Sequence, residues 1–158
     1  MSNTDHTRQS VDKLILGLGS ALDIGGLSLD DDALCLLEID GGNFVEIEYR
    51  EDTEKVVLTS EIGTIPDALQ AAWFPRLLEA NAFWVGTGGA TLGVHQVTGK
   101  LIQCYQEPVR GMAIERFVGF FDAFVQSVQQ WQQRILEDPN QSQQSQPADA
   151  LQLMGQLV

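Results

Sequence analysis

The sequence predicts an α+β fold in which a twisted antiparallel sheet is covered by helices, in the order helix, three strands, helix, two strands, helix. Two observations predict it. Apolar residues recur every three or four positions near both ends of the chain. In the middle, short runs bounded by turn residues contain apolar residues that alternate with polar ones. The 158 residues, 44% of them hydrophobic, suffice for one domain with a core. We place that domain at residues 1–138 and a flexible tail at 139–158.

The first helix is predicted from Ser10 onward, because its apolar residues fall on one stripe. These residues are Val11, Leu14, Ile15, Leu18 and Leu22. Gly25 and Gly26 should end the helix, and Gly17 and Gly19 weaken it by about 1 kcal/mol each relative to alanine. The stripe either faces the chain's own sheet or leaves part of its surface for a partner, and the pattern alone leaves both readings open.

The next three runs predict an antiparallel meander over Ala33–Ile39, Phe44–Tyr49 and Lys55–Ser60. In the second run, Glu46 and Glu48 alternate with apolar residues. That period of two is typical of a strand with one buried face and one solvated face.

A second helix should begin after Pro66 and end near Asn81, with a kink at Pro75, since proline removes one backbone hydrogen bond. Two further strands are predicted at Trp84–Val94 and Lys100–Tyr105, joined as a hairpin.

The strongest periodic pattern predicts a long amphipathic helix from Ile114 to Ile135. Beyond it, Asn140–Pro147 is so rich in Gln and Ser that it lacks apolar groups to fold around. A last apolar group could dock on the domain, although fraying is the ordinary expectation. It comprises Leu151, Leu153, Met154 and Leu157.

Charge and cysteine content exclude several classes of protein. Nine Lys and Arg against 22 Asp and Glu give a net charge of −13, which repels phosphate backbones and anionic membranes. No run approaches the roughly 20 apolar residues that span a bilayer, and the polar N-terminus is no secretory signal. Cys35 and Cys104 form no CxxC pair, which favours a reducing cytosol. We expect neither nucleic-acid binding nor membrane insertion.

No motif indicates catalysis, a cofactor or a metal. The glycine-rich run 86–93 lacks the lysine of a phosphate-binding loop and the third glycine of a dinucleotide fingerprint. The run Asp30–Asp32 is followed by Leu34 and Cys35, where a calcium loop needs an oxygen ligand and a glycine. Glu46 and Glu48 share a strand face without a base or metal nearby, so we expect them to serve solubility.

The run Leu-Leu-Glu-Ala-Asn-Ala-Phe-Trp-Val-Gly-Thr-Gly-Gly-Ala-Thr-Leu at 77–92 resembles the class I type III secretion chaperones, the Tir-chaperone-like family. The Glu115-Arg116-Phe117 opening of the last helix adds to the resemblance, which covers roughly residues 8–136. Pro75 and the Gln-rich tail depart from the family pattern.

The resemblance implies a bacterial cytoplasmic homodimer without enzymatic activity or cofactor. It would bind the N-terminal chaperone-binding segment of one or more secreted effectors and keep it extended, soluble and export-competent. The secretion-apparatus ATPase would be a further partner. Carried over by position, the effector-binding residues are Leu14, Leu18, Leu22, Val94, Leu101 and Ile102. The dimer-interface residues are Trp73, Leu77, Trp84, Gly88 and Leu92.

A second hypothesis is a cytosolic regulatory or ligand-binding α+β domain that is not tied to secretion. Such a domain would need polar groups that converge in an apolar pocket, and no motif in the sequence indicates them.

Overall fold

A five-stranded antiparallel sheet forms the centre of the computed structural model, which describes residues 3–39 and 42–137, with side chains from residue 8. The strands are β1 (Leu34–Ile39), β2 (Asn43–Arg50), β3 (Lys55–Gly63), β4 (Thr91–Val94) and β5 (Leu101–Pro108). They lie in the order β1-β2-β3-β5-β4, so β1 and β4 are the two edges. The α+β class and the antiparallel arrangement predicted from the sequence are confirmed.

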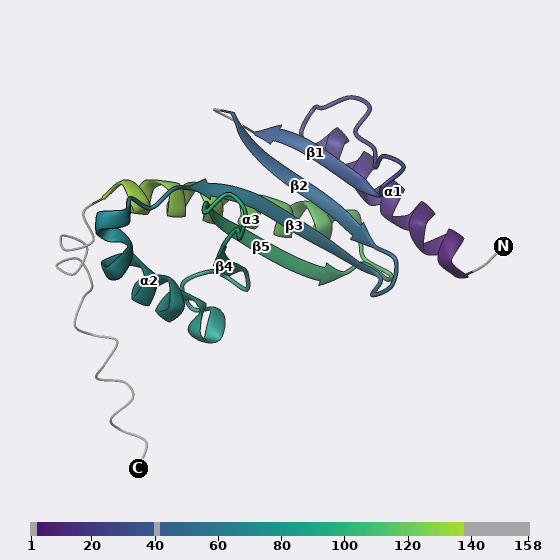
Figure 1. Cartoon of the computed structure of the whole chain (residues 1–158). Coiled ribbons are helices and arrows are strands. Elements are labelled where there is room, and N and C mark those ends of the chain that lie inside the picture. Colours follow the sequence, from purple (N-terminus) through teal and green to yellow (C-terminus); the bar gives the residue numbers. More distant parts are fainter. Residues whose placement is uncertain (1–2, 40–41, 138–158) are drawn as a thin grey trace, which may run out of the picture.

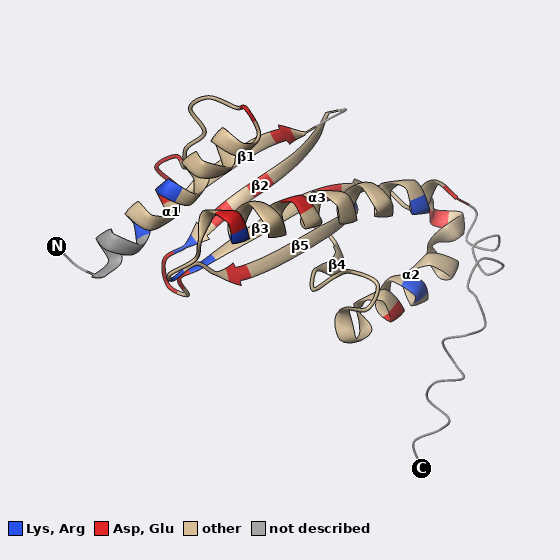
Figure 2. Ribbon diagram, turned by 180° about the vertical axis from the view of Figure 1, so that it is seen from behind, with Lys and Arg blue, Asp and Glu red and all other residues tan. Residues whose placement is uncertain are grey.

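The helices are α1 (Asn3–Ala21), α2 (Asp67–Asn81) and α3 (Ile114–Leu136), with a short 3-10 turn, η1 (Ala82–Trp84), after α2. Helices α1 and α3 contact each other on one face of the sheet, whereas α2 lies beyond the sheet next to β4 (Figures 1 and 2). Helix α1 begins earlier than the expected Ser10. Helix α2 includes Pro75 and is a single element; the kink predicted there stays a prediction.

The core lies between the sheet and the pair α1 and α3. Alternate residues of β2 point into it, with Val45, Ile47 and Tyr49 buried, while Glu46 lies on the solvated face. From α3 the core receives the stripe predicted by its period, namely Phe117, Phe121, Phe124, Val128, Trp131 and Ile135. No helix in the described part of the chain covers the opposite face of the sheet (Figure 1).

The prediction of a strand over Trp84–Val94 was wrong for its first half. Only Thr91–Val94 pairs with β5. Before it, Phe83 and Trp84 have φ values of 55° and 56°, and Gly88 and Gly89 have 61° and 98°. These left-handed conformations fold the chain into local turns, in which the amide of Gly86 donates to the carbonyl of Ala80 at 3.2 Å. The glycine-rich run is therefore a compact turn.

Asn81, the last residue of α2, fixes this turn to the sheet. Its side-chain amide donates to the carbonyl of Leu92 at 2.9 Å, and its side-chain oxygen accepts from the amide of Leu92 at 2.8 Å. The two bonds replace the partners that a neighbouring strand would supply at the sheet edge. Helix α2 is held against β4 in this way.

Candidate functional site

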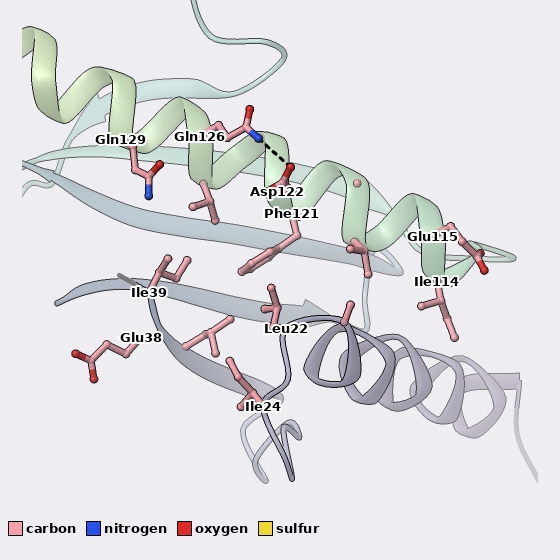
Figure 3. A pocket seen from close by; sticks show the side chains of 15 residues that line it. Leu22, Ile24, Glu38, Ile39, Ile114, Glu115, Phe121, Asp122, Gln126 and Gln129 are labelled. Atoms are coloured by element: carbon pink, nitrogen blue, oxygen red, sulfur yellow. Dashed lines mark hydrogen bonds between the residues drawn. The ribbon is translucent and has the colours of Figure 1, made fainter. Parts of the chain in front are cut away.

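A groove of about 1030 Å³ lies between the C-terminal end of α1, strand β1 and helix α3 (Figure 3). We call it the α1–β1–α3 groove. Its apolar lining residues are Ala21, Leu22, Ile24, Leu37, Ile39, Ile114, Val118, Phe121 and Val125. Leu22 and Ile24 are 40% and 36% exposed, although their side chains are fully apolar. The groove therefore exposes apolar side chains that no helix or strand in the described part of the chain covers.

Polar groups at the groove are acidic or neutral. Glu38, Glu115 and Asp122 contribute carboxylates, and the side-chain amide of Gln126 donates to Asp122 at 2.9 Å (Figure 3). No Lys, Arg or His is among the residues that line it. A bound molecule would therefore meet an apolar floor with a negative rim, which favours apolar side chains with basic neighbours.

Strand β1 forms one side of the groove and is also an edge of the sheet. It pairs with β2 from Leu34 to Ile39, and the described residues supply no strand on its other side. Its residues alternate, with Cys35 and Leu37 buried toward the helices and Leu36 64% exposed on the opposite face. An edge of this kind can hydrogen-bond an added strand, whose alternate side chains would enter the groove.

A second, shallower depression of about 570 Å³ lies on the open face of the sheet. Leu36 and Phe44, 64% and 48% exposed, line it together with the half-buried Ile102. The ammonium of Lys100 contacts Glu61 at 2.6 Å at its border. Because Leu36 belongs to β1, a strand at that edge would also contact this face.

Five apolar side chains of α2, η1 and the residue that follows η1 are exposed to solvent. They are Phe74, Leu78, Phe83, Trp84 and Val85. Phe83 and Val85 are 90% and 86% exposed, and Leu78 is 70% exposed. We call this surface the α2–η1 patch. Large apolar side chains that gather so openly are typical of a protein–protein contact.

The clustering and the pKa values of the titratable groups bear on metal binding and on nucleophilic chemistry. No three His, Cys, Asp or Glu side chains in these ranges lie close enough to hold a metal ion. Burial, and secondarily the Asp30 carboxylate, raise the pKa of the Cys35 thiol. Burial and the hydrogen bond to Glu107 raise the pKa of Tyr105, which donates to that carboxylate at 3.0 Å. Both shifts keep the group neutral, the opposite of what an activated nucleophile requires.

Comparison with known proteins gives the family. The model of the Tir chaperone protein (CesT) family matches residues 13–132, more than half of the chain. The chain belongs to the Tir chaperone protein family. This family consists of chaperones and confirms the resemblance seen in the sequence.

Several solved structures share the fold of this chain. A chain of the HopA1–SchA chaperone–effector complex is 16% identical with a TM-score of 0.69, over 81% of this chain and 97% of that one. A chain of the ExsC–ExsE complex is 21% identical with a TM-score of 0.70, over 80% and 93%. A chain of the ExoT–SpcS complex from Pseudomonas aeruginosa is 16% identical with a TM-score of 0.59, over 77% and 96%. No curated protein matched the chain by sequence.

The residues predicted for effector binding do not lie on one surface of this Tir chaperone fold. Leu14, Leu18 and Leu101 are 3%, 0% and 1% exposed and belong to the core, so a partner cannot reach them in this conformation. Leu22 lines the groove, and Ile102 lies on the open face of the sheet. Val94, 49% exposed, ends the other edge strand, β4. Of the six, only Leu22 belongs to the groove.

The residues predicted for the dimer interface divide in the same way. Trp73, Leu77 and Leu92 are at most 6% exposed and belong to the core, whereas Trp84 and Gly88 are exposed. Sequence reasoning missed the outer residues of the same helix. Phe74 and Leu78 follow Trp73 and Leu77 by one position each and therefore point about 100° away around the helix. Apolar residues on two sides of one short helix were the available signal.

The structure also adds α3 residues that sequence reasoning had left in the core stripe. Val118 and Val125 are half-buried and line the groove, next to the buried Phe121. No helix in residues 3–39 and 42–137, α3 included, is long and apolar enough to cross a bilayer.

Proposed function

We propose that this chain is a type III secretion chaperone that holds an extended segment of a secreted effector in the α1–β1–α3 groove. One observation carries the proposal, namely that an apolar groove lies directly beside the outer edge of β1, where Asp30 bonds to the backbone of Leu34 and no described strand pairs with residues 35–39. An extended peptide gains backbone hydrogen bonds from such an edge and places every second side chain in the apolar groove. Neither contribution requires catalysis or nucleotide.

The acidic rim specifies the chemistry of the cargo. With Glu38, Glu115 and Asp122 around the groove and a net charge of −13, the bound segment should carry Lys or Arg beside its apolar residues. Since these carboxylates are close to solvent, salt screens their attraction over about 8–10 Å at physiological ionic strength. Cargo binding should weaken as salt rises, mainly through slower association.

The experiment begins with the tagged chain in its own cells, without added nucleotide, and identifies the secreted protein that it retains. The N-terminal segment of that protein then titrates the wild-type chain and Leu22→Asp. Covering the exposed 40% of Leu22 contributes about 0.8 kcal/mol, and the aspartate must also lose water, so at least tenfold weaker binding is expected. Val97→Asp is the matched control, because Val97 is 88% exposed in the β4–β5 connection and should bind normally.

Equal affinity of Leu22→Asp and wild type would refute the groove as the cargo site. Retention of folded, non-secreted proteins alone would instead support a regulatory domain that is not tied to secretion.

We also propose that two copies associate through the α2–η1 patch as a homodimer, with Trp84 and Gly88 at the contact. The support is the exposure of five large apolar side chains on one surface, which a second copy would cover by the same surface. Phe83→Asn tests this, since asparagine tolerates the left-handed backbone at φ 55° and removes the most exposed ring. Light scattering should show a monomer, whereas Leu136→Asn, at an equally exposed leucine on α3, should keep the dimer mass.

A further inference from the structure

The chain carries its own segment of suitable chemistry for the groove. From residue 150 onward the sequence reads Ala-Leu-Gln-Leu-Met-Gly-Gln-Leu-Val and contains no charged side chain. Leu151, Leu153 and Leu157 occupy odd positions, and Gln152 and Gln156 occupy even ones. This period of two is the pattern of a strand with one apolar face. We propose that residues 151–158 pair with the outer edge of β1 beyond Leu34, whose backbone groups bond to Asp30, and fill the α1–β1–α3 groove when no cargo is bound.

The alternation of this segment matches that of β1. On β1, Leu37 points to the helices and the groove. Leu36 and Glu38 alternate to the other side of the strand, where Leu36 lines the depression on the open face and Glu38 lies at the border of the groove. A strand with its leucines in the groove would place Met154 on the face of Leu36, where its flexible apolar side chain packs well. Gln152 and Gln156 would share that face with Glu38, and amide groups can donate to a carboxylate.

Charge also favours this occupant over most of the chain's other segments. The groove carries carboxylates and no basic group, so an acidic strand would be repelled there. Glu38 forms no ion pair with any described residue. A neutral apolar segment avoids the repulsion, and it binds without the added attraction of a basic cargo. The tail segment should therefore bind the groove more weakly than the basic cargo proposed above.

The connection is long enough to reach the groove. Helix α3 ends at Leu136, and its groove-lining residues run from Gln129 back to Ile114. These residues lie about 10 Å and 33 Å from the end of the helix at 1.5 Å per residue. The fourteen residues 137–150 can span up to about 46 Å when extended. Any random-coil segment of fourteen residues has an average end-to-end distance of about 20 Å, which is close to the distance from the end of α3 to the middle of the groove.

Tethering converts weak binding into useful competition. A short flexible linker gives an effective concentration of about 1 mM, so a segment with an intrinsic Kd of about 0.1 mM would occupy the groove about ten times more often than not. Cargo would then bind about tenfold more weakly than to an open groove. The tail would cover apolar surface until a basic, better-matched cargo displaces it. This inference rests on the proposed cargo groove.

Hydrogen exchange of the full-length chain tests the tail. Leu153→Asp/Leu157→Asp places two charges on the apolar face of the segment. Ser142→Asp/Ser145→Asp, the matched control, adds the same charges to the linker. Exchange of the β1 amides, residues 34–39, should be several-fold faster in the first variant than in wild type, and unchanged in the control. The β4 amides, residues 91–94, are an internal reference and should not change in either variant. Equal β1 exchange in all three proteins would overturn the proposal.

Cargo titration separates this inference from the proposed function. The probe is the N-terminal segment of the secreted protein recovered by the tagged chain, and Leu153→Asp/Leu157→Asp should bind it about tenfold more tightly than wild type. Unchanged β1 exchange together with weak cargo binding by Leu22→Asp would refute the tail and support the cargo groove. Faster β1 exchange with normal cargo binding by Leu22→Asp would support the tail in the groove and refute cargo binding there.

Discussion

Replacement of Gly17 by alanine tests how α1 and α3 meet at one end of the groove. A Cβ atom at Gly17 would lie 2.7 Å from the Cγ2 atom of Ile114 and 3.2 Å and 3.3 Å from two further atoms of that side chain. The 2.7 Å distance is too short for two carbon atoms, so the Ile114 side chain or one of the helices must shift. Alanine in place of glycine raises helix stability by about 1 kcal/mol, while overpacking costs about 1–3 kcal/mol. We expect Gly17→Ala to lower the free energy of unfolding by up to about 2 kcal/mol.

Gly119→Ala is the matched control. Gly119 lies inside α3, and a Cβ atom there would have no neighbour within 4 Å outside its own helix. Only the higher helix propensity of alanine remains, so this variant should be more stable than wild type by about 1 kcal/mol. Both variants are measured by urea unfolding at one protein concentration, since the stability of a dimer depends on concentration.

The double variant Gly17→Ala/Ile114→Ala isolates the contact. Shortening Ile114 removes the atoms that the new methyl group would meet, so Gly17→Ala should become stabilising in that background. The coupling energy between the two sites should be about 1–3 kcal/mol. If Gly17→Ala stabilises the wild-type chain as much as Gly119→Ala does, the close approach of α1 and α3 is refuted.

Three further outcomes are expected. Asn81→Ala should cost about 1–3 kcal/mol in urea unfolding, because the amide and carbonyl of Leu92 lose their partners, and Asn81→Asp should cost less because it retains an acceptor. The free energy of unfolding should fall as pH rises above 9.0, the ordinary pKa of the thiol, because Cys35 ionises in the unfolded chain before it ionises in the folded one. In Cys35→Ala this fall should begin only near 10.0, the ordinary pKa of the tyrosine hydroxyl. Gly88→Val should cost about 1–2 kcal/mol through strain at φ 61°, and Gly88→Asn less, so equal losses would exclude the backbone as the cause.

Regular elements could be predicted from the sequence because their periods reflect burial. The stripe of α3 predicted a helix from Ile114 to Ile135, and the structure has Ile114–Leu136. The segment 84–90 could not be predicted, since a run of apolar residues and glycines fits a strand equally well. Its course is decided by left-handed conformations at Phe83 and Trp84, which neither residue type favours.

The candidate site was harder to predict than the fold. Leu18 and Leu22 occupy the same stripe of α1 and are indistinguishable by period, yet Leu18 is buried and Leu22 is 40% exposed. The difference arises because α1 ends at Ala21, so Leu22 lies beyond the last turn of the helix and lines the groove beside β1. Period indicates which face of a helix is apolar, whereas exposure depends on where the neighbouring element stops.

The two glycines that weaken α1 help to build the groove. Gly17 lets Ile114 approach, and a Cβ atom at Gly19 would lie 2.8 Å from the carbonyl oxygen of Ile24 and 2.9 Å from the Cβ atom of Leu27. The chain after α1 therefore folds back against the helix, held by the amide of Ile24 bonding to the carbonyl of Gly19 at 2.8 Å. This return places Leu22 and Ile24 in the groove wall. The helix loses about 2 kcal/mol of intrinsic stability at these positions. Because each glycine faces a residue that lines the groove, a side chain at either position would disturb the groove wall.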